Sequence, residues 1–481
     1  MLQPQPINPR QLMKHLTPRR SFLRNSSAAL LASTIPNIIP SRSWGQNAPS
    51  RKLNVALIGC GGRGGADMSA ALQRGVNLIA LCDADLPRTQ SIRETLAKAA
   101  PESQDMIAKA KSYQDYRELI AKEPSLDAVI IAVGPWWHVP LSMAFMKAGK
   151  HVYCEKPLCR MVGEARAMAE FAKTCNVVTP MGTQGVADKD FRRSIEAVHA
   201  GLLGQVRELH VWESTRNGPF DPSHERPEGE DKVPDGFNWD LWVGPSPMRP
   251  FKAKTYQHGC RTTMPWIDFA GALLGDFGTH TWQCPIRSLK LEHPTHVEHN
   301  IPEPVKETWA SNAKIRYEFG KRGDLAPLTA WFYDSINMPP KHELLTEIEA
   351  YRKNELRLGA IMIGDNGALY TGGWGGGNFI KLKGDTRMSS VMGHPEVKKL
   401  AQTEPLNLKQ DHMLEWIDAA MGNGKTYQPL DVAARSMEVF MPALVSYRMQ
   451  RAIDWDGPNM RVPNAPEADK FITPDYRKQW L

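Results

Sequence analysis

The fold of this chain is decided by Asn54-Val-Ala-Leu-Ile-Gly-Cys-Gly-Gly-Arg-Gly-Gly65. An apolar run rich in β-formers, Val55 to Ile58, leads into the glycine turn Gly59-x-Gly61-x-x-Gly64 and then into a helix-compatible segment. A second apolar run, Val76 to Cys82, ends at Asp83, 19 residues after Gly64. A strand, a glycine turn, a helix and a strand that ends in an acid form the pattern of a dinucleotide-binding unit. The glycine turn by itself also fits an ordinary βαβ unit.

Each part of this turn has a physical role in holding a dinucleotide. Gly59 permits the tight turn, Gly61 lets the backbone approach a pyrophosphate, and Gly64 lets the helix pack close to the strand. The helix N-terminus offers N–H groups and the positive end of its dipole to the phosphates. A carboxylate at Asp83 favours the ribose hydroxyls of NAD over a 2′-phosphate, although the nearby Arg88 leaves NADP open. The expected cofactor-binding residues of this unit are Gly59, Gly61, Gly62, Arg63, Gly64 and Asp83.

The composition is that of an ordinary soluble globular protein. The 481 residues suffice for two or three domains, and 42% of them are hydrophobic and 23% charged. The net charge of +7 is accounted for by basic residues in the first 51 positions, which contain no acid, so nothing indicates a nucleic-acid partner. No uninterrupted run of about 18 apolar residues exists, so we expect no transmembrane helix in the folded part.

The N-terminal segment has the pattern of an export signal. Thr17-Pro-Arg-Arg-Ser-Phe-Leu-Arg24 precedes a weakly apolar stretch, Ser27 to Ile39, and resembles a twin-arginine signal; a disordered basic tail is the alternative. We expect residues 1–50 to be signal and linker, and the chain to be exported by the twin-arginine machinery to the periplasm. Because no nicotinamide pool is replenished there, such an enzyme is expected to hold its cofactor tightly.

Two further loops follow predicted buried strands. Leu126 to Val133 is a fully apolar strand that ends in Gly134-Pro-Trp-Trp-His138. The next strand, His151 to Cys154, delivers Glu155-Lys156-Pro157. Since ligands bind at the carboxyl ends of parallel strands in open α/β sheets, we expect both loops to border the cofactor.

The glycine turn with Asp83, the Pro-Trp-Trp-His loop and Glu155-Lys156-Pro157 together resemble the Gfo/Idh/MocA oxidoreductases over residues 52–457. The resemblance implies an α/β chain with an N-terminal Rossmann domain (51–182) and a C-terminal α/β domain built on a large, mostly antiparallel open sheet (183–457), followed by an arm (458–481). It implies a homodimer or homotetramer. It adds four residues to the cofactor side, namely Pro135, His138, Glu155 and Lys156.

An acid and a histidine four residues apart stand in Gly271-Ala-Leu-Leu-Gly-Asp276-Phe-Gly-Thr-His280. In a helix they share one face, where a carboxylate can orient an imidazole; by spacing alone they also fit a helix cap and a surface histidine. Matched to the family pattern G-x-L-x-D-x-G-x-H, His280 falls on the general base and Asp276 on its companion. No metal is expected: no third ligand stands at a suggestive spacing, no HExxH is present and the seven cysteines contain no C-x-x-C pair.

The resemblance implies NAD(P)-dependent oxidation of a CH–OH group of a sugar, polyol or glycoside. His280 accepts the hydroxyl proton, Lys156 hydrogen-bonds the same oxygen and Asp276 holds the imidazole. Tryptophan faces suit carbohydrate stacking, and the sequence offers Trp136 and the candidates Trp137, Trp212, Trp239 and Trp266. Because tryptophan is also a good core residue, two or three of these five are expected to be purely structural. The run Gly372 to Gly377 is interpreted as a flexible loop, since it lacks the strand and helix of a second nucleotide site.

Three alternatives to a dehydrogenase stay open. Some relatives in the glycoside hydrolase family 109 group run a redox-neutral cycle of oxidation, elimination and hydration with bound NAD. A sugar–sugar transhydrogenase is also redox-neutral. A non-enzymatic sugar-binding protein with a vestigial Rossmann fold is the third, and the intact glycine turn, Lys156 and His280 argue against it.

Overall fold

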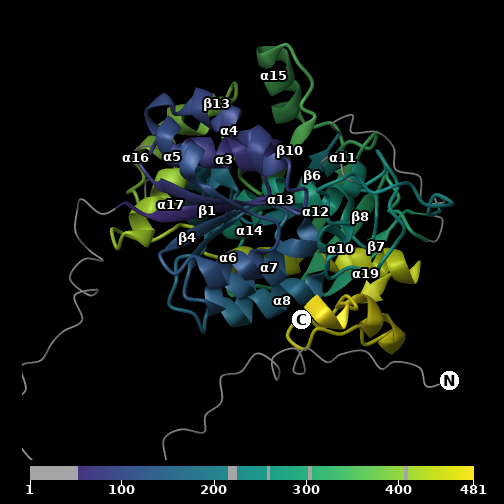
Figure 1. Ribbon diagram of the computed structural model, residues 1–481. Coiled ribbons are helices and arrows are strands. Elements are labelled where there is room, and N and C mark those ends of the chain that lie inside the picture. Colours follow the sequence, from purple (N-terminus) through teal and green to yellow (C-terminus); the bar gives the residue numbers. More distant parts are fainter. Residues whose placement is uncertain (1–51, 215–224, 257–259, 302–305, 406–409, 481) are drawn as a thin grey trace, which may run out of the picture.

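The computed structural model describes residues 52–480 except 215–224, 257–259, 302–305 and 406–409. The expected signal and linker, residues 1–50, lie outside the described residues. Two sheets organise the described chain, with the N-terminal domain on one side of the molecule and the larger sheet on the other (Figure 1). The predicted fold class, a Rossmann domain followed by an α/β domain with a large open sheet, is confirmed.

The N-terminal sheet has five parallel strands in the order β3-β2-β1-β4-β5. Its strands are buried on both faces, as in β4, because helices cover both sides. The elements of this domain are β1 (Asn54–Ile58), α3 (Gly62–Leu72), β2 (Asn77–Cys82), α4 (Arg88–Ala99), α5 (Gln104–Lys109), β3 (Lys111–Tyr113), α6 (Tyr116–Lys122), β4 (Ala128–Ile131), α7 (Pro135–Lys147), β5 (His151–Cys154) and α8 (Val162–Ala172).

The C-terminal sheet has nine strands in the order β13-β12-β11-β10-β6-β9-β8-β7-β14, and β6 and β9 are its one parallel pair. Buried and partly exposed residues alternate along β8, as expected when a sheet buries one face. Its strands are β6 (Val206–Glu213), β7 (His296–His299), β8 (Lys314–Phe319), β9 (Leu328–Asp334), β10 (Leu358–Gly364), β11 (Gly367–Gly372), β12 (Phe379–Leu382), β13 (Ser389–Ser390) and β14 (Ile453–Asp454).

The second part contains the α-helices α9 to α19, which follow the 3-10 turn η2. These elements are η2 (Gln184–Ala187), α9 (Lys189–His199), α10 (Trp239–Val243), α11 (Cys260–Thr263), α12 (Ala272–Asp276), α13 (Gly278–Thr281), α14 (Gln283–Ser288), α15 (Glu343–Arg352), α16 (Pro395–Lys399), α17 (His412–Ala420), α18 (Leu430–Phe440) and α19 (Pro442–Met449). In Figure 1, α15 projects from the body of the molecule. No helix among the described residues is long and apolar enough to cross a membrane.

Two later segments return to the Rossmann domain. Helix α17 packs on α3, where Arg74 forms an ion pair with Asp411 and Trp416 is fully buried. The C-terminal arm lies beside α8 (Figure 1). The N–H of Gly163 in α8 donates a hydrogen bond to the carbonyl of Ile472 in the arm, at 2.8 Å. The two domains are therefore tied together by α17, which comes between β13 and β14 in the chain, and by the arm after β14.

Candidate active site

The glycine turn between β1 and α3 has the geometry that a phosphate needs. Gly59 has φ +91°, and a side chain there would collide with the carbonyl of Ala132. A side chain at Gly64 would collide with the carbonyl of Gly59. At Gly62, in contrast, an added Cβ would meet nothing within 4 Å, and Gly61 caps α3 without a side-chain hydrogen bond. The turn therefore leaves an open space against the helix N-terminus, and this space fits a pyrophosphate.

Asp83 stands at the end of β2, beside this turn. Its carboxylate accepts hydrogen bonds from the backbone N–H of Cys60, at 2.7 Å, and of Asp85, at 2.9 Å. Burial raises the pKa of Asp83, and these two N–H groups oppose that rise. Arg88 pairs with Asp85 at 3.0 Å. The placement of Asp83 fits an acid that bonds the ribose of a dinucleotide.

Arg63 links the glycine turn to the Glu155-Lys156-Pro157 loop. Its guanidinium forms ion pairs with Asp67, one helical turn further along α3, and with Glu155, at 3.1 Å. Burial, followed by the charge of Glu155, raises the pKa of Asp67 to about 8. Glu155 also accepts a hydrogen bond from the amide of Gln184 at 2.7 Å. Half of the Arg63 side chain is exposed.

His138, which is expected on the cofactor side, lies inside the first domain. The side chain is fully buried in α7, and its Nδ1 lies 2.6 Å from the carbonyl of Pro157. Because a carbonyl only accepts, Nδ1 carries the proton, and burial lowers the pKa of the imidazole to about 4. His138 thus fixes the loop that carries Lys156 instead of lining an open surface. Pro135, in the first turn of α7, is buried as well.

Lys156 and Asp276 form the central ion pair of the site. The ammonium Nζ of Lys156 lies 2.8 Å from Oδ1 of Asp276, and only 18% of the lysine side chain and 4% of the aspartate side chain are exposed. The sequence-based expectation was that Asp276 holds the imidazole of His280. The structure pairs it with Lys156 because α12 ends at Asp276 and α13 starts at Gly278, and because a buried carboxylate is better compensated by a cation than by a neutral ring.

His280 lies in α13 next to this pair and is buried. Its Nε2 has no hydrogen-bond partner among the described residues, and the same holds for Oδ2 of Asp276. Burial lowers the pKa of His280 well below 6.5, and the positive charges of Lys156 and Arg63 lower it further. At neutral pH the imidazole is therefore uncharged and able to accept a proton.

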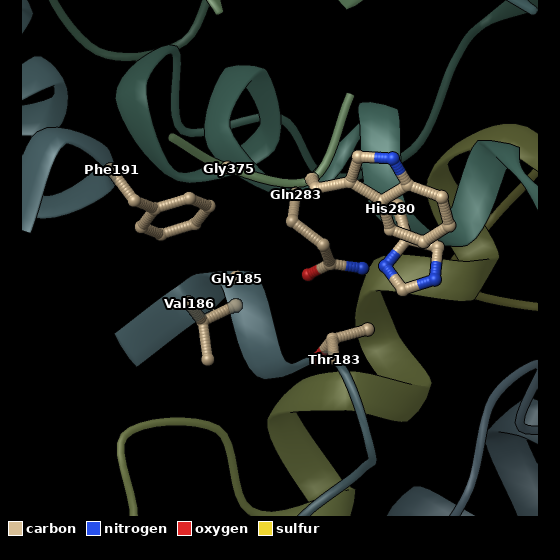
Figure 2. A pocket seen from close by; sticks show the side chains of 8 residues that line it. Thr183, Gly185, Val186, Phe191, His280, Gln283 and Gly375 are labelled. Carbon is tan, nitrogen blue, oxygen red and sulfur yellow. The ribbon is translucent and has the colours of Figure 1, made fainter. Parts of the chain in front are cut away.

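A narrow pocket adjoins His280 (Figure 2). It is lined by residues from η2, α9, α13, α14 and the loop after β11, namely Thr183, Gly185, Val186, Phe191, His280, Gln283, Trp374 and Gly375. Figure 2 shows the side-chain amide of Gln283 directed at the imidazole of His280. Gln283 in turn accepts from Gln428, which accepts from the hydroxyl of Thr183 at 3.1 Å. A buried polar chain thus ends at Gln283, whose amide nitrogen has no hydrogen-bond partner among the described residues.

The four tryptophans expected to stack on a substrate are all buried core residues. Trp137 donates its indole N–H to the carbonyl of Leu241 at 3.0 Å, and Trp239 donates to that of Arg249 at 2.7 Å. Trp212 and Trp266 are likewise no more than 7% exposed. The structure thus places these four tryptophans in the core, where a large side chain that donates its indole N–H to a carbonyl is well accommodated. The sequence did not indicate Trp374 or Gln283, the residues next to His280.

Among the described residues no cluster of three or more His, Cys, Asp or Glu side chains is arranged to hold a metal ion. The residues that meet at the site are instead one ammonium, one carboxylate and one neutral imidazole, from the loop after β5, from α12 and from α13. Such a set binds a hydroxyl group and moves its proton.

Comparison with known families assigns the class. The family described as an oxidoreductase family with an NAD-binding Rossmann fold matches residues 53–183, and its C-terminal alpha/beta domain matches residues 191–324. The first domain is therefore an NAD-binding Rossmann domain. The chain belongs to the Gfo/Idh/MocA oxidoreductase family, as the motifs predicted.

Similar proteins include sugar and polyol enzymes. The chain is 33% identical over 146 residues to a myo-inositol 2-dehydrogenase of Thermotoga maritima, covering 30% of this chain and 42% of that protein. It is 24% identical over 231 residues to a glycosyl hydrolase family 109 protein of Stenotrophomonas maltophilia, covering 47% and 49%. It is 28% identical over 175 residues to a levoglucosan dehydrogenase of Pseudarthrobacter phenanthrenivorans, covering 35% and 44%. These matches span about half the length of the curated relatives.

Solved structures share the fold over most of the chain. An inositol dehydrogenase homolog complexed with NAD⁺ from Azotobacter vinelandii has a TM-score of 0.55 at 19% identity and covers 84% of this chain and 98% of that one. An aldose–aldose oxidoreductase from Caulobacter crescentus has a TM-score of 0.53 at 16% identity, covering 84% and 100%. At these identities the likeness shows the fold alone.

Proposed function

We propose that this protein is an NAD-dependent oxidoreductase that acts on a CH–OH group of a sugar, polyol or glycoside. The observation that carries the proposal is the buried Lys156–Asp276 ion pair beside a neutral His280 whose Nε2 has no partner among the described residues. The three side chains lie at the carboxyl-end side of the Rossmann sheet, since Lys156 follows β5 by two residues. Relatives named as inositol and levoglucosan dehydrogenases support the substrate class.

The residues of the first domain have distinct places in cofactor binding. The open backbone at Gly61 and Gly62, with Arg63, would hold the pyrophosphate, and Asp83 would hold the ribose hydroxyls. Bound NAD⁺ would supply an acceptor for the hydride that leaves the carbinol carbon.

The protein's own groups act on the hydroxyl of the substrate. Nε2 of His280 accepts the hydroxyl proton, so the C–O bond becomes a carbonyl as the carbon loses its hydride. Nζ of Lys156 donates a hydrogen bond to the same oxygen and stabilises the negative charge that develops there. Asp276 holds the ammonium in place at 2.8 Å. In the reverse direction the imidazolium of His280 returns the proton to the carbonyl oxygen.

The test is turnover by the purified protein. Its absorption spectrum is recorded for bound dinucleotide, and then myo-inositol, levoglucosan and glucose are added with and without external NAD⁺. Accumulation of NADH with at least one of them supports the proposal. A protein that binds no dinucleotide, or that leaves NAD⁺ unreduced with every CH–OH donor tried, contradicts it.

A redox-neutral glycosidase is a second candidate. It is favoured by the several similar proteins named as glycosyl hydrolase family 109 members, at 24–32% identity. In that case the same three residues would assist the oxidation of one sugar carbon at the start of the cycle and its reduction at the end. Release of nitrophenol from nitrophenyl glycosides without external NAD⁺ and without net NADH identifies this activity, and its absence together with NADH formation from free sugars excludes it.

Export and assembly belong to the proposal as well. The pair Arg19-Arg20 with the apolar stretch after it supports twin-arginine export to the periplasm, with the cofactor already bound. A reporter fused to residues 1–50 should reach the periplasm, and replacement of both arginines by lysine should keep it inside. Light scattering on the purified chain tests the proposed homodimer or homotetramer.

A further inference from the structure

The glycine-rich loop after β11 carries an exposed tryptophan. Trp374 lies in Gly372-Gly-Trp-Gly-Gly-Gly377 and is 57% exposed, and no other tryptophan among the described residues belongs to the exposed class. A large apolar side chain that stays in water at the edge of a site indicates a contact with a ligand. The segment is a loop, as its sequence indicates, and its backbone is hydrogen-bonded to neighbouring elements.

The loop backbone is held from several sides. A side chain at Gly375 would come within 2.6 Å of the carbonyl oxygen of Gly185, so the loop lies directly on the backbone of η2. The N–H of Gly377 donates to Asp190 at 3.0 Å, and its carbonyl accepts from Arg352 at 2.7 Å. The amide of the fully buried Asn378 donates to the carbonyl of Gly375 at 3.0 Å. The indole is therefore presented from a fixed backbone.

The ring borders the groups that act on the substrate hydroxyl. Its centroid lies 4.5 Å from the imidazole of His280, in an edge-on arrangement, and 6.1 Å from the ring of Phe277. The ring of Phe277 in turn lies 5.5 Å from Nζ of Lys156. A ligand whose hydroxyl reaches His280 and Lys156 therefore has the indole of Trp374 at its side.

We propose that the exposed indole of Trp374 is the stacking surface for the substrate ring and makes the site selective for cyclic over open-chain CH–OH donors. The inference rests on the proposed function, because it assigns the substrate class of the same site. The C–H groups of a pyranose or cyclitol form a flat apolar face that complements the negative face of an indole. An open-chain polyol has no such rigid face and loses more conformational entropy when it binds.

The test compares ring and chain substrates of equal hydroxyl count in three variants. Myo-inositol is the cyclic probe, and sorbitol is the open-chain probe with the same number of carbons and hydroxyls; levoglucosan is a second cyclic probe. Trp374→Ala removes the surface, and Trp374→Phe keeps an aromatic face. Ile336→Ala, which alters an 81% exposed apolar residue on the turn after β9, is the matched control.

Trp374→Ala should raise KM for the cyclic probes by about 3- to 10-fold, the usual size of one aromatic contact, and leave KM for sorbitol unchanged. Trp374→Phe should recover part of the loss, and Ile336→Ala should behave as the wild type. The affinity for NAD⁺, measured by calorimetry, should be the same in all variants. An equal change for ring and chain probes, or no change for any, overturns the inference.

A binding measurement separates this inference from the proposed function. Saturation-transfer NMR on the NAD⁺-loaded protein detects whether the ring protons of levoglucosan and myo-inositol contact the protein, with or without turnover. Ring binding that is lost in Trp374→Ala while no probe is oxidised by the wild type supports the stacking surface and contradicts the oxidoreductase proposal. Absence of ring binding by the wild type, or binding that is unchanged in Trp374→Ala, overturns the stacking surface.

Discussion

Replacement of Lys156 by methionine should damage both the stability and the activity of this protein, for different reasons. Methionine keeps most of the length of the lysine side chain and removes its charge. Asp276, 3% exposed, then loses the ammonium at 2.8 Å, and its other oxygen already has no partner among the described residues. Breaking a buried ion pair by removal of one partner costs about 3–5 kcal/mol, and we expect the lower end because the lysine is 18% exposed.

The loss of activity has a separate origin. Removal of one preorganised donor from the oxygen that gains negative charge lowers kcat by about 10²–10³-fold. A second substitution separates the two effects. In Lys156→Met/Asp276→Leu an apolar pair of similar volume replaces the ion pair, so most of the stability should return, whereas kcat should remain low.

The assay follows the unfolding midpoint in urea and NADH formation on the same preparations. The expected order of stability is wild type close to the double variant and both above Lys156→Met. A double variant with turnover close to that of the wild type would refute the catalytic role of Lys156. A loss of stability below about 1 kcal/mol in Lys156→Met would refute the conclusion that the ion pair is desolvated.

Three further predictions concern the histidines of the site and the core. Burial and neighbouring cations lower the pKa of His280 well below 6.5, so its neutral form persists in mild acid. The value of kcat/KM for oxidation should therefore stay constant as the pH falls through 6.5 and decline only at lower pH. A decline that begins at or above pH 6.5 contradicts this prediction. Gln283→Glu would place a carboxylate at the imidazole and raise the pKa of His280, so the acid limb should move to higher pH, whereas a role in packing alone would leave the profile in place. His138 and His412 are buried with pKa values lowered to about 4, so below pH 6.5 the unfolded chain binds protons that the folded chain does not. The free energy of unfolding should therefore be highest above pH 6.5 and fall by roughly 3 kcal/mol for each histidine toward pH 4. His412→Phe should weaken this pH dependence in acid unfolding curves.

The sequence predicted the fold well because the signals for it are local. A strand, a glycine turn and a helix occupy adjacent residues, and β5 was expected at His151 to Cys154, where it is observed. Family resemblance supplied the C-terminal sheet and the candidate residues Lys156, Asp276 and His280, which the structure brings together. Their pairing was not predictable by local geometry, since Lys156 and Asp276 are 120 positions apart and the helix expected to unite Asp276 with His280 is broken between them.

For the tryptophans, residue type alone did not predict which side chains are buried and which are exposed beside the site. Trp212 on β6 is fully buried because its side chain faces the cluster under α15, and nothing in its flanking sequence distinguishes it from a surface aromatic. Trp374 is a single large side chain among five glycines, and the sequence analysis interpreted this pattern as a flexible loop. Glycine allows a backbone to lie directly on another backbone, and at Gly185 and Gly375 that close approach is what the structure uses. A tryptophan held in this way is placed largely by its backbone, so more than half of it stays exposed to a ligand although its ring also contacts His280 and Phe277.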